Sequence, residues 1–153
     1  RLVGSEMCIR DRACIDILDY CGISLRGKRA VVVGASLVIG RPVAMMLLAR
    51  GATVTLCHID TVDLPSECRR AELIIAAAGA RALLNQDCLS PGQVILDVGV
   101  TVGPDGRLYG DVDFEAANAV VEALTPVPGG VGTVTTTILA KHVIEAAKRT
   151  FPQ

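Results

Sequence analysis

Residues 125–133 read Thr-Pro-Val-Pro-Gly-Gly-Val-Gly-Thr, and these residue types at this spacing are suited to contact a ligand. The two prolines stiffen the backbone, and the three glycines leave it bare, so that a flat ligand can lie against it. The apolar helical pattern from Val134 would place the free N–H groups of a helix N-terminus nearby, which an anionic or carbonyl-rich ligand prefers. An ordinary strand-to-helix turn is the alternative, but the density of Pro and Gly favours a ligand-contacting loop.

A second glycine-containing loop follows the buried-strand run 30–33 and reads Gly-Ala-Ser-Leu-Val-Ile-Gly-Arg-Pro over residues 34–42. A helical pattern comes next, and residues 53–57 read as another strand. Strand, glycine loop, helix and strand open a dinucleotide-binding βαβ unit. The spacing departs from G-x-G-x-x-G, because Ser36 stands where the second glycine would. A flavodoxin-like sheet with a tight turn and no nucleotide stays open as the alternative.

Further apolar runs supply the elements that must position these two loops. The sequence predicts two more strands and several helices: strands over 73–79 and 93–99, and helices over 13–20, 64–70, 113–121 and from Val134 to about Arg149. Strands that alternate with helices predict an α/β fold with a Rossmann-like, doubly wound parallel sheet and right-handed crossovers.

Composition agrees with this fold and limits the partners. Of the 153 residues, 51% are hydrophobic and only 3% aromatic, which fits an aliphatic sheet covered by helices on both faces. The net charge of −1 gives no field that would attract nucleic acid or a membrane surface, so neither is expected as a partner. Scattered cysteines and the lack of a signal peptide favour a cytoplasmic location.

No metal site is expected. None of the cysteines forms a Cys-x-x-Cys pair, and the two histidines, His58 and His142, lie far apart in the sequence. The cysteines are interpreted as small buried hydrophobes: Cys8, Cys14, Cys21, Cys57, Cys68 and Cys88.

With these motifs in view, the chain resembles the C-terminal, cofactor-binding domain of the bifunctional methylenetetrahydrofolate dehydrogenase/methenyltetrahydrofolate cyclohydrolase family. The matching motifs fall in order between residues 13 and 147: Gly27-Lys28, Val33-Gly34-x-Ser36-x-x-x-Gly40-Arg41-Pro42, Ala52-Thr53-Val54-Thr55-x-Cys57-His58, Asp97-Val98-Gly99, Gly110-Asp111-Val112-Asp113-Phe114 and Thr125-Pro126-Val127-Pro128-Gly129-Gly130-Val131-Gly132. The resemblance implies hydride transfer from methylene-tetrahydrofolate to NADP or NAD, then hydrolysis of the methenyl form. It also implies a folate substrate and a homodimer.

The resemblance further implies roles for single residues. The cofactor-binding positions are Gly34, Ala35, Ser36 and Gly40 in the pyrophosphate and ribose loop, Ile59 after the second strand, and Val100 near the nicotinamide end. The loop on the folate side of the cleft comprises Pro128, Gly129, Gly130, Val131 and Gly132. Asp97 and Asp111 are interpreted as structural, one as a strand-end cap and the other as a turn former.

The sequence departs from the family pattern at the cofactor end. Ala35 stands where members often carry Arg, and Ile59-Asp60 replaces Ser followed by a basic residue, so groups that suit a 2′-phosphate are missing. Thr133 also replaces the usual Pro after Gly132. Residues 1–12 match nothing in the family and are expected to be a foreign or misassembled leader, with residues 13–153 forming the NAD(P)-binding domain.

The catalytic lysine and tyrosine of the family belong to an N-terminal folate-binding domain, and the sequence contains no Tyr-x-x-x-Lys. No catalytic residue is therefore assigned, and the chain alone is expected to be inactive. Two alternatives stay open: another NAD(P) dehydrogenase domain of the shikimate dehydrogenase type, and a stand-alone dinucleotide-sensing module.

Overall fold

The computed structural model describes residues 9–150, except for the side chains of residues 142 and 145–150. The helices are α1 (Ile9–Tyr20), α2 (Gly40–Ala49), α3 (Leu64–Arg69), the short 3₁₀ helix η1 (Gln86–Cys88), α4 (Phe114–Asn118) and α5 (Val131–Thr150). The strands are β1 (Arg29–Val33), β2 (Thr53–Cys57), β3 (Leu73–Ala76), β4 (Val94–Asp97), β5 (Thr101–Val102), β6 (Leu108–Tyr109) and β7 (Ala123–Leu124).

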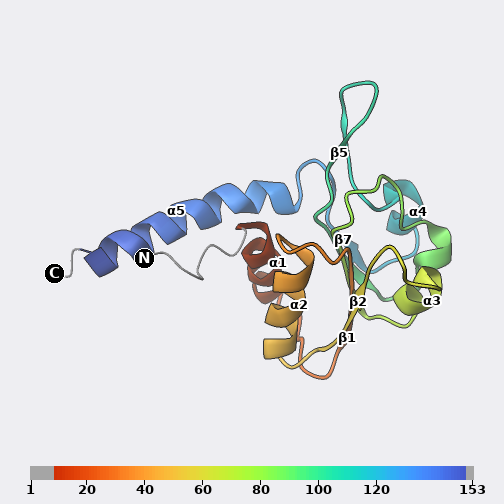
Figure 1. The fold of residues 1–153 in the computed structure, drawn as a ribbon, viewed down its shortest axis with the longest axis horizontal. Helices are drawn as coiled ribbons and strands as arrows, with labels where there is room; N and C mark the ends of the chain where they lie inside the picture. Colours follow the sequence, from red (N-terminus) through yellow and green to blue (C-terminus); the bar gives the residue numbers. More distant parts are fainter. Residues whose placement is uncertain (1–8, 151–153) are drawn as a thin grey trace.

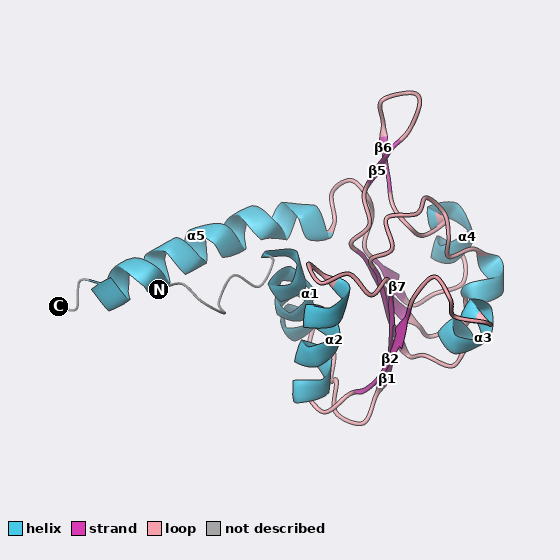
Figure 2. Ribbon diagram, viewed as in Figure 1, coloured by secondary structure: helices cyan, strands magenta, loops and turns pink. Residues whose placement is uncertain are grey.

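The main sheet has five parallel strands in the order β2-β1-β3-β4-β7. Figure 2 shows this sheet edge-on, with β1, β2 and β7 labelled. The chain leaves β1 for one edge of the sheet, returns on the other side of β1 as β3, and continues to the opposite edge. The strand order therefore reverses between β1 and β3, and open α/β sheets bind their ligands outside the carboxyl ends of the strands at such a point. The predicted doubly wound parallel sheet is confirmed.

Helices cover both faces of the sheet, with α1 and α2 on one side and α3 and α4 on the other (Figure 1). Alternate side chains along each strand pack against the helices of the two opposite layers. Val32 and Leu96 pack with α1, α2 and the start of α5, whereas Val31 and Ile95 pack with α3, η1 and α4. Strands that are buried on both faces need aliphatic side chains at every position, which explains the continuous apolar runs.

Side-chain caps fix the start of several helices. Asp63 accepts a hydrogen bond from the backbone N–H of Ser66 at the start of α3 (3.1 Å). Asp113 accepts one from the N–H of Ala116 at the start of α4 (3.3 Å). Each cap satisfies an N–H group that has no partner within its own helix.

The boundaries of several predicted elements are wrong by a few residues, and α5 begins at Val131 rather than at Val134. Helix α1 begins at Ile9 instead of residue 13, and its first turn is reinforced by the Arg12–Asp16 ion pair at i,i+4. Helix α4 ends at Asn118 rather than at residue 121. Strands β3 and β4 end at Ala76 and Asp97, before the glycines that were included in them.

Three short strands were not predicted as strands. β7 has two residues and pairs with the first half of β4. β5 and β6 form an antiparallel hairpin that projects beyond the sheet in Figure 1. The turn over residues 103–106 closes this hairpin, since the Gly106 N–H donates to the Gly103 carbonyl (2.9 Å). Most of the segment expected to be a foreign leader, residues 1–8, lies outside the described residues.

Candidate functional site

A cleft of about 790 Å³ opens at the carboxyl ends of β1, β2 and β3, beside the point where the strand order reverses. Three loops supply its lining: Val33, Gly34, Ala35 and Arg41 around the first glycine loop, His58, Ile59, Asp60, Thr61 and Leu64 after β2, and Ala78, Ala80 and Leu83 after β3. Apolar walls with a few charged groups at the rim are typical of a small-molecule site.

Backbone packing explains both glycines of the first loop. Gly34 has a φ of +108°, and a Cβ there would lie 2.2 Å from the carbonyl oxygen of Ala77 at the end of β3. A Cβ on Gly40 would lie 1.7 Å from the carbonyl oxygen of Gly34. The two glycines therefore bring the loop, the start of α2 and the end of β3 together, and substitution of either would deform the loop itself.

Ser36 connects the same loop to α2. Its hydroxyl accepts hydrogen bonds from the backbone N–H groups of Ile39 (3.1 Å) and Gly40 (3.4 Å). Within residues 9–150, the N–H groups of Ala35 to Val38 donate to no protein acceptor. Consecutive free N–H groups before a helix form a favourable environment for a phosphate, so the loop fits the pyrophosphate of a dinucleotide.

The turn after β2 carries the cleft's one carboxylate. The N–H of His58 donates to Oγ1 of Thr61 (2.9 Å), and the N–H of Asp60 donates to Nδ1 of His58 (3.2 Å). The Asp60 side chain is 85% exposed, and its Oδ2 lies 3.6 Å from Nδ1 of His58. Ile59 is 98% exposed and presents an apolar side chain at the cleft.

The buried Asp111 holds the loop after β3 in place. Its Oδ2 accepts hydrogen bonds from the N–H groups of Ala78 (2.6 Å) and Gly79 (2.9 Å), and its Oδ1 accepts one from Ala80 (2.8 Å). A Cβ on Gly99 would lie 2.0 Å from the same carboxylate. A glycine is required there because the carboxylate approaches the backbone closely.

Asp97, at the end of β4, holds Asp111 in turn. Its carboxylate accepts from the N–H groups of Gly99 (3.1 Å), Asp111 (3.1 Å) and Val112 (2.9 Å). Burial raises the pKa of Asp97 to about 6, although these N–H donors favour the ionised form and oppose the shift. Asp97 caps the end of its strand, as the sequence predicts. Asp111 is structural too, but it bonds to a loop more than thirty residues away and does not form the predicted local turn.

A second pocket, of about 260 Å³, lies at the carboxyl end of β4 and is almost wholly apolar. Val100 and Leu108 from the projecting hairpin form one part of its wall, and the Pro/Gly loop forms another. Its lining comprises Arg10, Asp97, Val98, Val100, Leu108, Val127, Pro128, Gly129, Val131, Gly132 and Thr133. The Val127–Pro128 peptide bond is cis.

The predicted site residues divide between these two hollows. Gly34, Ala35 and Ile59 line the cleft, and Val100, Pro128, Gly129, Val131 and Gly132 line the second pocket. Ser36, Gly40 and Gly130 line neither. Gly130 packs against the loop itself, since a Cβ there would lie 2.3 Å from the carbonyl oxygen of Pro126.

Sequence reasoning missed the cleft wall after β3 (residues 78–83) and the contribution of Arg10 to the second pocket. A signal for the first existed: β3 is followed by Ala-Gly-Ala, and the strand beside β1 at the reversal point borders the ligand. For Arg10 there was none, because the predicted helix began after it.

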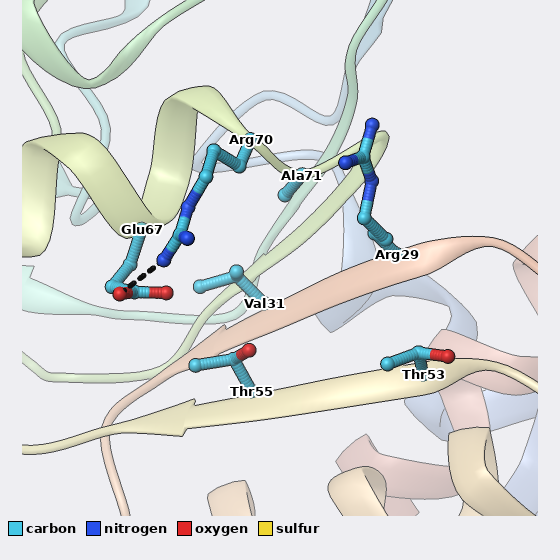
Figure 3. Close-up of a pocket in the computed structure, with 7 residues that line it drawn as sticks. All are labelled: Arg29, Val31, Thr53, Thr55, Glu67, Arg70 and Ala71. Carbon is cyan, nitrogen blue, oxygen red and sulfur yellow. Dashed lines mark ion pairs between the residues drawn. The ribbon is translucent and has the colours of Figure 1, made fainter.

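A further hollow, of about 160 Å³, lies between the edge strand β2, the neighbouring β1 and α3 (Figure 3). Arg29 and Thr53, at the amino ends of their strands, line it. Its other arginine, Arg70, is paired with Glu67. Its place away from the carboxyl ends of the strands separates it from both predicted loops.

Four of the five described cysteines are buried as predicted, whereas Cys21, in the turn after α1, is exposed. Burial raises the pKa of the Cys57, Cys68 and Cys88 thiols, that of Cys68 to about 12, so these three are poor nucleophiles. No group of three or more His, Cys, Asp or Glu among residues 9–150 could hold a metal ion. No helix in that part of the chain has the length and apolar character needed to cross a bilayer.

The strand order, the glycine loop with free N–H groups and the cleft at the reversal point define a dinucleotide-binding α/β domain. Comparison with known proteins agrees. The family described as tetrahydrofolate dehydrogenase/cyclohydrolase, NAD(P)-binding domain, matches residues 9–151. The chain belongs to this family.

Individual relatives support this assignment. The chain is 49% identical over 138 residues to the bifunctional protein FolD of Carboxydothermus hydrogenoformans, covering 89% of this chain and 48% of the relative. The structure matches FolD methylenetetrahydrofolate dehydrogenase/cyclohydrolase from Campylobacter jejuni with a TM-score of 0.92 and 42% identity, over 95% of this chain and 51% of that one. The Trypanosoma brucei FolD, solved with NADP and an inhibitor, matches with a TM-score of 0.88 and 35% identity, over 95% and 52% of the two chains. The chain thus spans about half the length of the curated relatives it matches.

Proposed function

We propose that this chain is the NAD(P)-binding part of a bifunctional methylenetetrahydrofolate dehydrogenase and methenyltetrahydrofolate cyclohydrolase. The observation that carries the proposal is the placement of two hollows at one edge of the sheet. A cleft with apolar walls, next to the free N–H groups of the first glycine loop, lies beside an apolar pocket lined by the Pro/Gly loop. The cleft is suited to a nucleotide, and the apolar pocket is suited to flat rings.

In this proposal the cleft receives the adenosine half of the cofactor. The N–H groups of Ala35 to Val38 bind the pyrophosphate, and Ile59, Leu64 and Leu83 provide apolar contacts for the adenine. Arg41 lies at the rim, with its Nε–H donating to the carbonyl oxygen of Ala35 (2.9 Å). These contacts fix one end of the cofactor and orient the other.

The nicotinamide end points toward the second pocket. Val100 and the exposed Pro128 and Gly129 present a flat surface with few polar groups, which excludes water from the reacting faces. When bound, the cofactor supplies the hydride acceptor. The folate lies across this pocket, and its one-carbon bridge is contacted from the other side by a folate-binding domain.

This chain supplies binding and orientation, and its residues supply no general acid or base. Asp97, the carboxylate that lines the second pocket, accepts hydrogen bonds from three backbone N–H groups. We therefore expect the purified chain to bind dinucleotide and to give no turnover. The working enzyme combines it with a folate domain that carries the Tyr-x-x-x-Lys pair, as a homodimer in the cytoplasm.

The experiment measures binding and activity separately. Isothermal calorimetry with NAD⁺ and NADP⁺ should detect binding to the chain, and Ala35→Trp, which fills the cleft, should weaken it at least tenfold. Ala119→Trp is the control, since residue 119 is exposed at the end of α4 and does not line the cleft.

Methylene-tetrahydrofolate oxidation and methenyl-tetrahydrofolate hydrolysis should stay at the uncatalysed rates. Binding that is unchanged in a folded Ala35→Trp variant would contradict the assigned cleft, and turnover by the chain alone would contradict the assigned division of roles.

A further inference from the structure

The cleft is lined by few charged side chains, and the positive and the negative one lie on different loops. Among its lining residues, Arg41 is the one with a permanent positive charge and Asp60 is the one carboxylate. The nicotinamide cofactors differ in this region by a single group, the adenosine 2′ substituent, which is a hydroxyl in NAD and a phosphate in NADP. The charge at the end of β2 therefore decides which cofactor is favoured.

The Asp60 carboxylate is available to a ligand. Its side chain is 85% exposed, and its Oδ2 lies 3.6 Å from Nδ1 of His58, which accepts the Asp60 N–H and therefore donates no hydrogen bond to the carboxylate. The ring of His58 is itself oriented by the Asp60 N–H, which donates to Nδ1 (3.2 Å). Since no backbone N–H is bonded to the carboxylate, its acceptor capacity is free for the hydroxyl groups of a ribose.

Arg41 is held away from the end of β2. Its Nε–H donates to the carbonyl oxygen of Ala35, which places the guanidinium against the glycine loop. Its charge therefore favours the pyrophosphate, and the turn over residues 58–61 contains no Lys or Arg. A 2′-phosphate near this turn would meet a carboxylate and no fixed cation.

Resting on the proposed function, we propose that Asp60 makes this chain select NAD over NADP. The carboxylate accepts hydrogen bonds from the ribose 2′-hydroxyl, and it repels a 2′-phosphate that carries −1.5 to −2 charges. Asp60 is thus the residue that determines cofactor specificity. His58 positions the turn that carries Asp60.

The test is calorimetric titration of the purified chain with NAD⁺ and NADP⁺ at pH 7.5. We expect NAD⁺ to bind at least tenfold more tightly. Asp60→Ser removes the charge from an exposed side chain and should lower this preference at least tenfold, with most of the change in NADP⁺ affinity. Asp63→Asn is the matched control: it removes an equal charge three residues away, outside the cleft lining, and keeps the oxygen that caps α3. Its preference should stay within twofold of the unmodified chain.

Three results would overturn the inference. Tighter binding of NADP⁺ by the unmodified chain excludes selection for NAD and leaves the proposed function standing. An unchanged preference in Asp60→Ser excludes Asp60 as its source. Binding of neither dinucleotide contradicts the proposed function, and the inference with it.

Discussion

At the scale of single residues, two buried carboxylates determine the shape of the site. Asp111 has no exposed surface, and its two oxygens together accept three backbone N–H groups of the loop that forms one wall of the cleft. Asp97 accepts three N–H groups from the strand end and from the segment that carries Asp111. Both hold the walls of the candidate site through bonds to backbone N–H groups.

We expect Asp111→Asn to lower the free energy of unfolding by about 1–3 kcal/mol, because an amide NH₂ would face a backbone donor and leave it unsatisfied. Urea denaturation measures the loss. Asp113→Asn is the control: Asn caps helices as well as Asp does, so its cost should stay below about 0.5 kcal/mol. Equal effects of the two substitutions would show that the three hydrogen bonds of Asp111 contribute little.

Asp97 makes stability depend on pH. Its folded-state pKa is raised to about 6 from 3.8, so between those values the folded chain binds more protons than the unfolded chain does. The contribution of Asp97 to the free energy of unfolding is therefore fully present below about pH 4 and falls as the pH rises through 6, by about 3 kcal/mol in total. A ¹³C NMR titration of its carboxyl carbon should give a midpoint near 6. A midpoint at or below 4 would show that the three N–H donors outweigh the burial.

At the scale of elements, the glycines differ in what they do. Gly40 is the first residue of α2, and a Cβ there would overlap the carbonyl oxygen of Gly34. Gly132 lies in the first turn of α5, and a Cβ there would point into open space. The sequence predicted both as ligand-contacting glycines. Only the structure separates the glycine that permits packing from the one whose Cβ would meet open space.

We expect Gly40→Ala to destabilise the chain by about 3 kcal/mol, since the new methyl group would overlap backbone that cannot move without the whole loop. Gly132→Ala should stabilise it by about 0.5 kcal/mol, because alanine loses less backbone freedom on entering a helix. Thermal denaturation followed by circular dichroism compares the two. A Gly40→Ala variant that melts at the unmodified temperature would contradict the packing described for the loop.

The sequence predicted the interiors of elements better than their ends. The apolar runs of β1 to β4 act locally, and all four strands were predicted. The end of β4 depends on a contact with β3, which is distant in the sequence. The N–H groups of Val98 and Gly99 both donate to the carbonyl oxygen of Ala76, and this shared acceptor ends the regular strand pairing. Such a contact cannot be seen in a local pattern. The same applies to β7, whose two residues are a strand only because β4 is beside them.

At the scale of the whole molecule, the site follows from topology more than from motif. The Pro/Gly loop and the first glycine loop are almost a hundred residues apart, and the parallel sheet brings both to the carboxyl ends of its strands. The sequence could predict this edge, because parallel strands share a carboxyl end. It could not predict the loop over residues 78–80 as a wall, since that loop is shaped by a buried side chain that lies more than thirty residues further along the chain.

The series Asp97–Asp111 also has a consequence for motion. The amides of Ala78, Gly79 and Ala80 are bonded to Asp111, whose own amide is bonded to Asp97, so none of these groups can open without disturbing the next. In hydrogen exchange they should behave as one cooperative unit with a common opening free energy, whereas the Gly106 amide at the hairpin tip should exchange sooner. NAD⁺ in the cleft should slow exchange at Asp111 and Val112 too, although neither lines the cleft. A ligand bound in either hollow would order this unit and so lower the entropic cost of binding a ligand in the other. The affinities of the two hollows would then be coupled without any change in the structure.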